Sequence, residues 1–362
     1  MPTSLCRRLR SYVKKIWYAG TVFHKVCILE VMIDLLFVIW LVILPFIFFS
    51  GAYEGPKVVW LLGGGLLITL FWTIRLFRRH PMKVTKSGWW LLAWIALLGI
   101  ASVIGIHPID SLVGGSNRYQ GIFFFFTLFL IGETLLLLSA HHKHILRSLL
   151  GFATVVESVI VIEQKLFSWG SQPLGTVGGA YAVTIFLVVG LWWVSQWHGI
   201  SKLLRAACYL VTLVAIVSTL WGSGITLSNL QSQSQHRIQY WRMGIREVIK
   251  RPILGYGAGS EEVVYEDALQ LQNIPVYTVR IDQVHNLFLD VALWSGMVGL
   301  VVFVGWLATL IYKMLSAREP LRLIVFFVLL AYACVAPMGA VLWVQLVVLL
   351  LVEQLPYYLK TH

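Results

Sequence analysis

Residues 282–290 read DQVHNLFLD and close a polar interval, 223–285, that lies between two apolar blocks of the chain. Nearly everything before and after this interval has the composition of membrane-spanning helices. The polar interval is therefore where chemistry in water can take place. The pattern predicts an all-α integral membrane protein with one large outward loop.

Hydrophobic residues make up 59% of the 362 residues and charged residues only 12%, with a mean hydropathy of +0.81. These values indicate a polytopic membrane protein and a lipid bilayer as its surroundings. The net charge of +12 does not indicate a nucleic-acid partner, because the basic residues form short clusters between apolar runs. The four cysteines show no CxxC and no pairing pattern, so neither a disulfide framework nor a zinc site is predicted.

A spanning helix needs about 20 apolar residues. Candidate spans lie at about 29–49, 57–76, 88–106, 120–140, 145–164, 181–197, 203–222 and 286–312. A final apolar run, 321–355, is too long for one crossing and contains Pro337-Met338-Gly339, which predicts a hairpin of two helices. The total is about ten transmembrane helices.

Clusters of Lys and Arg predict which connections face the cytoplasm. They place the N-terminus inside and the connections 50–56, 107–119, 165–179 and 223–285 outside. The predicted organisation has four parts: a basic amphipathic cytoplasmic segment over 1–28, seven spans over 29–222, the outward loop over 223–285 and C-terminal spans over 286–362.

The outward loop has internal order. A Ser/Gln-rich lead is followed by a helical pattern over 236–251, in which Ile238, Trp241, Ile245 and Val248 recur at helical spacing. This pattern predicts a helix that lies on the outer surface, with its aromatic side towards lipid or protein. A glycine turn over 255–259 and an acidic stretch come next.

Basic residues on an outward loop oppose the usual charge bias and therefore point to an anionic partner. They are Arg118, Arg237, Arg242, Arg246, Lys250, Arg251 and Arg280. The arginine fork suits a phosphate-bearing lipid. Contact with lipid headgroups, or pairing with the acidic stretch, is the alternative explanation for each of them.

His285 precedes a helix whose predicted N-cap is Asn286. The positive helix end disfavours imidazolium, so a neutral ring able to accept a proton is expected. Asp282, one turn earlier, is the candidate to orient that ring. A histidine at a membrane interface can also be a simple amphipathic anchor.

Two carboxylates, Glu133 and Glu157, fall inside predicted spans, where they suggest either a polar cavity or ion path, or a neutral packed side chain. The outward loops contain no DxD and no His/Cys set with ligand spacing, so no metal site is predicted.

Three phrases resemble the O-antigen ligase and O-antigen polymerase family of membrane glycosyltransferases. Residues 236–241 (HRIQYW) with 251–257 (RPILGYG) form the first, 282–300 (DQVHNLFLDVALWSGMVGL) the second, and 115–121 (GSNRYQG) the third. The family usually also has a Ser-Arg phrase before the large loop. Residues 218–226 contain no arginine, and Arg280 is the candidate substitute.

The resemblance implies a GT-C-like bundle in the bacterial plasma (inner) membrane, with its active site on the periplasmic or extracellular face. It implies a glycan donor on a polyprenyl (undecaprenyl) diphosphate, an acceptor on a glycan, lipid or protein, no metal or cofactor, and inversion at the anomeric carbon. His285 matches the catalytic histidine, and Arg237 and Arg118 match diphosphate-binding arginines, with Trp241 and Asn286 in support.

Other functions remain open from the sequence alone. An O-antigen polymerase or a protein O-oligosaccharyltransferase would share this chemistry and differ in the acceptor. A lipid-linked oligosaccharide flippase or other transporter is the alternative that Glu133 and Glu157 suggest. A catalytically inactive scaffold that binds the lipid is a third.

Overall fold

The computed structural model describes residues 31–47, 54–77, 84–115, 118–167, 176–177, 180–197, 200–222, 227–270, 283–316 and 320–351. These residues form helices and connections and contain no strand. The predicted N-terminal segment 1–28 lies outside them.

The predicted all-α membrane architecture is confirmed: a helix lies in every predicted span. After the helix Val31–Phe46, which ends in the 3₁₀ turn η1 (Leu44–Phe46), the longer helices are α2 (Glu54–Phe77), α3 (Lys86–Val103), α5 (Ile122–Leu137), α6 (Ala140–Phe167), α7 (Ala180–Ser195), α8 (Lys202–Gly222), α9 (Leu227–Lys250), α11 (Leu287–Ser316), α12 (Pro320–Ala333) and α13 (Ala340–Leu351). Four helices, α3, α6, α8 and α11, are long and apolar enough to cross a membrane by length and composition.

Two features confirm the predicted chain breaks. The final apolar run is a hairpin of α12 and α13, which turns at residues 334–339. Helix α9 ends at Lys250, before Pro252, although it begins at Leu227 and not at 236 as predicted. Two short helices were not predicted: α4 (Pro108–Val113) and α10 (Glu261–Gln270).

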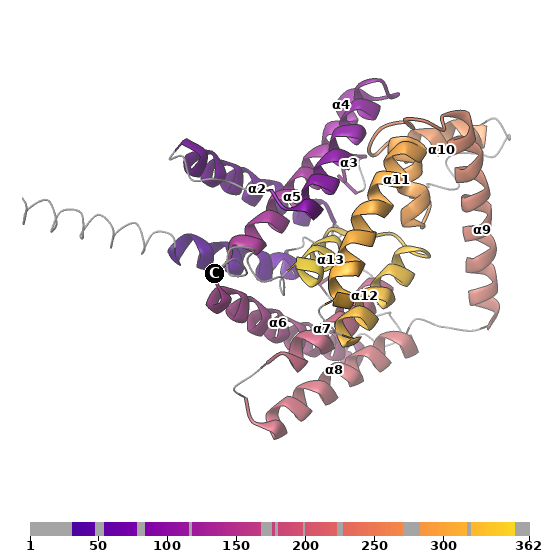
Figure 1. Ribbon diagram of the computed structural model, residues 1–362. Coiled ribbons are helices and arrows are strands. Elements are labelled where there is room, and N and C mark those ends of the chain that lie inside the picture. The colour runs from indigo at the N-terminus through magenta and orange to yellow at the C-terminus, as the bar shows by residue number, and fades with distance from the viewer. Residues whose placement is uncertain are drawn as a thin grey trace, which may run out of the picture.

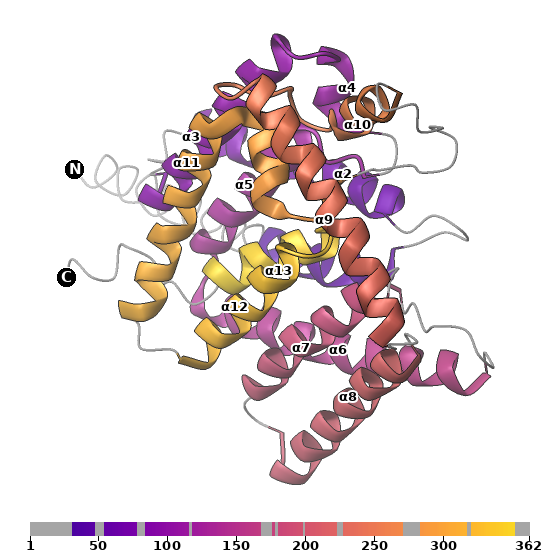
Figure 2. The same cartoon turned by 90° about the vertical axis from the view of Figure 1, so that its right-hand side faces the viewer.

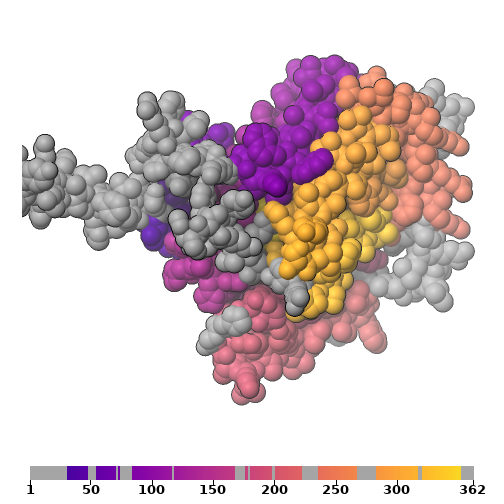
Figure 3. Space-filling model, in the orientation of Figure 1, coloured from indigo at the N-terminus to yellow at the C-terminus, as the bar shows by residue number. Residues whose placement is uncertain are grey.

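The main core forms where α5 packs against α2, α3 and α13, and where α3 runs along α11. Figure 3 shows the purple surface of the α3 and α4 region against the orange of α11. At its centre, the ring of Trp94 lies 4.9 Å from Phe125 and 5.0 Å from Phe303, centroid to centroid. Phe125 also makes an edge contact with Trp343. Such aromatic contacts fix the relative positions of α3, α5, α11 and α13.

Side-chain contacts show that the connections between helices lie at two ends of the bundle. At one end, Glu54 accepts a hydrogen bond from Ala340 N, and Gln120 donates one to the Met338 carbonyl. At the other, Lys313 Nζ lies 3.1 Å from Ser87 Oγ, and Arg322 donates to the last carbonyls of α13. This alternation agrees with the predicted order of connections; which end faces outward stays a prediction.

Helix α9 lies across the first of these ends. In Figure 1 it stands upright at the right-hand edge, while α2 and α6 run away from it to the left. Figure 2 shows it running obliquely down the front of the molecule, with α12 and α13 to the left of it. Its buried residues are Met243, Gly244, Glu247 and Val248, whereas Ile238 and Ile245 are 44% and 48% exposed. The buried residues of α9 therefore lie beside the predicted apolar stripe, and Val248 belongs to both.

Candidate functional site

Asn286 caps α11, as the sequence predicted. Its side-chain oxygen accepts hydrogen bonds from the backbone N–H groups of Phe288 (3.1 Å) and Leu289 (3.2 Å). Its side-chain nitrogen donates to the Cys334 carbonyl at 3.1 Å. One residue therefore joins the start of α11 to the end of α12, and it places half-buried His285 directly before a helix N-terminus.

The backbone at His285 has φ 58°, a left-handed conformation that few non-glycine residues adopt. The preceding residue is held by Asp290, whose Oδ1 accepts a hydrogen bond from Val284 N at 3.0 Å. Asp290 is 4% exposed. Its carboxylate thus folds the chain back over the first turn of α11 and stabilises the tight turn that presents His285.

The imidazole of His285 stacks on the ring of Tyr240 from α9, with centroids 6.0 Å apart and planes 22° apart. The Tyr240 carbonyl accepts a hydrogen bond from the Tyr265 hydroxyl at 3.2 Å. Tyr265 is fully buried, and this burial raises the pKa of its hydroxyl well above the usual value, so the proton is retained for this bond. Helix α10 therefore supports the part of α9 that faces His285.

The two predicted arginines of the diphosphate site lie on segments that border His285. Arg118, in the connection before α5, lines a pocket together with Gln283, two residues from His285. Arg237 lies on α9, one helical turn before Tyr240, whose ring stacks on His285. The segments that carry His285, Arg118 and Arg237 therefore meet.

The remaining predicted residues are partly buried, exposed, or outside the described part of the chain. Trp241 is half-buried beside Tyr240, and its indole N–H is buried with no hydrogen-bond partner in the described part of the chain. Asp282 and Arg280 lie outside the described residues. Arg242 and Arg246 are exposed on α9.

The glycine turn after α9 fits into a break in α11. Gly296 has φ 66° and ψ −173°, a conformation almost restricted to glycine, and it interrupts the helix. Tyr256 N and Gly257 N donate to the carbonyls of Leu293 (2.7 Å) and Trp294 (3.0 Å). Met297 N donates to the Pro252 carbonyl at 2.7 Å. The backbone groups freed by the break are therefore satisfied by the turn.

Tyr256 fixes this turn to the last part of α9. Its hydroxyl donates to Glu247 Oε2 at 3.1 Å, and Lys250 pairs with Glu247 Oε1 at 2.7 Å. The guanidinium of Arg251 lies 4.9 Å from the Tyr256 ring centroid. Burial and the neighbouring Glu247 carboxylate raise the pKa of Tyr256 to about 12, so the hydroxyl remains a donor at physiological pH.

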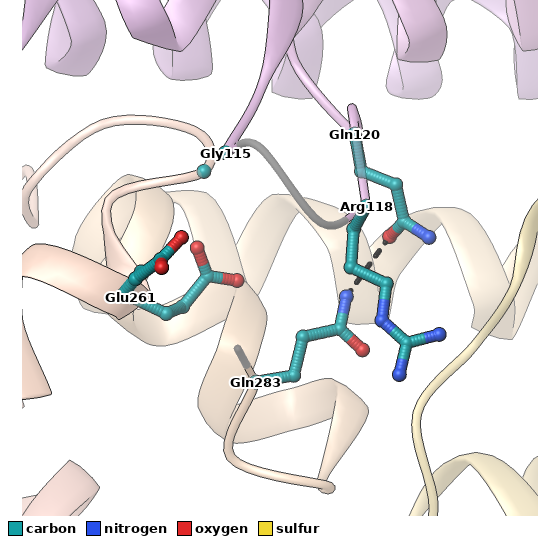
Figure 4. Close-up of a pocket in the computed structure, with 7 residues that line it drawn as sticks. Gly115, Arg118, Gln120, Glu261 and Gln283 are labelled. Carbon is teal, nitrogen blue, oxygen red and sulfur yellow. Dashed lines mark hydrogen bonds between the residues drawn. The ribbon is translucent and has the colours of Figure 1, made fainter. Parts of the chain in front are cut away.

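A small pocket lies beside Arg118, with about 280 Å³ of space that includes open solvent. Its lining residues are Gly115, Arg118, Gln120, Gly259, Glu261, Glu262 and Gln283. Figure 4 shows the Gln283 side chain between Glu261 and Arg118, with a hydrogen bond to Gln120. No group of three His, Cys, Asp or Glu side chains in the described residues is arranged to hold a metal ion.

Both carboxylates within the bundle have local partners. Glu157 accepts hydrogen bonds from Thr176 N (2.6 Å) and Thr176 Oγ1 (2.5 Å). Glu133 accepts from Thr85 N and Thr85 Oγ1 at the start of α3. Each therefore ties down a connection between helices, which accounts for its presence without an ion path.

The stretch of the chain that carries His285 matches a known protein family. Residues 174–304 match the O-antigen ligase family. The match confirms the resemblance over α7 to the first half of α11, which includes Arg237, Trp241 and His285, and it indicates a membrane glycosyltransferase of the O-antigen ligase or polymerase type. Arg118 lies outside it. No curated protein and no solved structure matches the chain.

Several residues of this region were missed from the sequence. Asp290 and Gln283 belong to the phrase that holds His285, and their closeness to it was the available signal. Gln120 lies in a turn, so no local pattern distinguishes it. Only its hydrogen bonds with Met338 and Gln283 show that it borders the site.

Proposed function

We propose that this protein transfers a glycan from a polyprenyl (undecaprenyl) diphosphate carrier to an acceptor hydroxyl at the outer face of the bacterial plasma membrane. The observation that carries the proposal is that the segments bearing His285, Arg237 and Arg118 meet: Tyr240 of α9 stacks on His285, and Arg118 lines a pocket with Gln283. The O-antigen ligase match over residues 174–304 supports the same reaction class.

In the proposed step, the acceptor oxygen attacks the anomeric carbon of the first sugar, and its proton passes to His285. The bond between the anomeric carbon and the diphosphate oxygen breaks, with inversion, and the lipid diphosphate leaves with the bonding electrons. The helix N-terminus next to His285 favours a neutral imidazole, as a general base requires. Stacking on Tyr240 and the Asp290 bond to Val284 hold the ring in place.

The leaving diphosphate gains negative charge, so cations aimed at it stabilise the transition state more than the ground state. Arg237 and Arg118 supply this charge in the proposal. Arg280 is a third proposed contact and Asp282 a second support for His285, both on sequence grounds. No metal ion or cofactor takes part in the proposed step.

Three functions share this chemistry and differ in the acceptor. An O-antigen ligase, an O-antigen polymerase and a protein O-oligosaccharyltransferase would all use this histidine and these arginines. The flippase alternative is less well supported, because the local partners of Glu133 and Glu157 account for the two carboxylates that suggested it.

The test is His285→Ala in the full-length protein, reconstituted with an undecaprenyl-diphosphate-linked glycan and an acceptor. Loss of a general base should slow the release of free lipid diphosphate by about 10²–10⁴-fold. The matched control is His236→Ala, which removes an exposed histidine of α9 and should leave release unchanged. Full activity of His285→Ala would exclude His285 as the base. Transbilayer movement of the donor with no release would favour a flippase.

A further inference from the structure

Two turns of the site have a strained backbone. Among the described residues, the non-glycine residues with positive φ are Tyr119 (56°) and His285 (58°). Tyr119 follows Arg118 in the connection before α5, and His285 precedes the cap of α11. A side chain makes this left-handed conformation unfavourable, so it persists only where surrounding contacts hold it. Both turns therefore need an anchor.

Two buried glutamines join these turns. Gln120 and Gln283 are each 2% exposed. The Gln120 side chain donates to the Met338 carbonyl at 2.5 Å, and the Gln283 side chain donates to Gln120 Oε1 at 3.2 Å. Because a carbonyl can only accept, Met338 fixes the orientation of the Gln120 amide and thereby that of Gln283. The three groups form a row with one direction, which we call the amide row.

The fixed end of the amide row is the turn between α12 and α13. Met338 lies in this turn, and at its other end the Cys334 carbonyl accepts the hydrogen bond from Asn286. Segment 283–286 is therefore attached to one turn at both of its ends, directly through its last residue and through the amide row at its first. His285, with its strained backbone, lies between the two attachments.

The amide row also fixes the distance between two parts of the proposed site. Gln120 is two residues from Arg118, and Gln283 is two residues from His285. In a one-step displacement, the base must reach the acceptor while a cation reaches the leaving diphosphate. A displacement of about 1 Å can slow such a step by about a hundredfold. Segments that carry the base and the cation must therefore be joined firmly.

We infer that Gln120 is a positioning residue, which sets the distance between Arg118 and His285 through its bonds to Gln283 and Met338. The inference rests on the proposed function and adds the contact that couples the cationic part of the site to the base. Gln120 acts through the two strained turns and not on the substrate. An uncharged amide suits this role, because it donates and accepts at once and does not titrate.

The first test is a double-mutant cycle on the full-length protein in lipid nanodiscs, with release of free lipid diphosphate as the readout. Gln120→Met and Gln283→Met each remove the amide bond and keep a similar size. We expect each to lower the maximal rate by about tenfold and to leave the half-saturating donor concentration within about twofold, since the charges remain. The double variant should be no slower than the slower single variant, because the bond is already lost.

Gln239→Met, at an exposed position of α9, is the control and should leave the rate unchanged. Losses that multiply in the double variant, or a changed donor requirement at an unchanged maximal rate, would contradict the inference. Wild-type rates in both single variants would contradict it as well and leave the proposed function intact. A wild type that releases no lipid diphosphate would overturn the proposed function, and the inference with it.

Gln120→Glu keeps the size of the side chain and decides the matter if the Met variants do not fold. A neutral carboxyl group donates to Met338 and accepts from Gln283 as the amide does, whereas an ionised one cannot donate. Burial raises the pKa of a carboxyl group, so the ratio of variant to wild-type rate should fall as the pH rises from about 5 to about 9. A ratio that does not change with pH would rule out the inferred role. The charged groups around this position are Arg118, Glu261 and Glu262 in the pocket and Glu54 beside the α12–α13 turn.

Discussion

The molecule contains two apolar cores of different construction. The bundle core joins the long helices through large side chains, with Trp94, Phe125 and Phe303 at its centre. The outer core is small and joins α9, α10 and the first half of α11; its buried members are Met243, Val248, Tyr256, Val264, Tyr265, Val284, Ala292 and Leu293. The predicted histidine and Arg237 lie beside the outer core, not the bundle core.

The difference concerns what holds each core together. In the bundle core, helices satisfy their own backbone groups, and side-chain packing sets their separation. In the outer core, backbone bonds cross between the 252–257 turn and the broken helix α11, and glycines at 255 and 296 permit the close approach. The bundle core should therefore tolerate loss of one contact, whereas the outer core should fail when a backbone approach is blocked.

Gly296→Ala is the change that should have the largest effect. A Cβ at this position would overlap the Ile253 carbonyl, and φ 66° with ψ −173° adds strain of about 1–3 kcal/mol. Displacement of the turn by about 1 Å would slow transfer by about a hundredfold. The control is Gly99→Ala in α3, where an added Cβ meets nothing within 4 Å. Equal rates of lipid diphosphate release for the two variants would refute the distinction between the cores.

Arg237→Ala should have an intermediate effect and sharpen the comparison at the site. Loss of a charge-assisted contact should weaken donor binding by about 10–100-fold. Arg246→Ala removes an exposed arginine from the same helix and should leave donor affinity unchanged. The measurement is the dependence of transfer on lipid donor at fixed acceptor. Equal losses in both variants would mean that α9 attracts the donor through its charge alone.

Trp193→Phe should have the smallest effect and test the tolerance of the bundle core. The indole N–H of Trp193 donates to Gln345 Oε1 at 2.8 Å, between α7 and α13. Its loss leaves the buried Gln345 oxygen without a donor, which should cost about 1–3 kcal/mol and lower the thermal unfolding temperature of the detergent-solubilised protein by a few degrees. Transfer at ordinary temperature should not change. A fall in turnover with unchanged stability would couple the bundle core to the site.

Much of the fold could be predicted because membrane helices follow from local composition. The lengths of the apolar runs predicted the helices, and the Pro-Met-Gly turn predicted the final hairpin. The residues beside Asn286 predicted that it caps α11. The burial of Glu247 on α9 was not predicted. Glu247 is buried because Tyr256 and Lys250 both bond to its carboxylate. A helical pattern in the sequence does not contain this information.

The sequence by itself determined the membrane class, the helices and the position of His285 at a helix start, because each depends on neighbours in the chain. Only the tertiary structure decided that α11 breaks at Gly296 around the 252–257 turn, that Asp290 supports the histidine turn, and that Gln120 orients Gln283. The breaks and amide chains join segments that are far apart in sequence. Their energies come from burial and from satisfied hydrogen bonds, which exist only once those segments pack together.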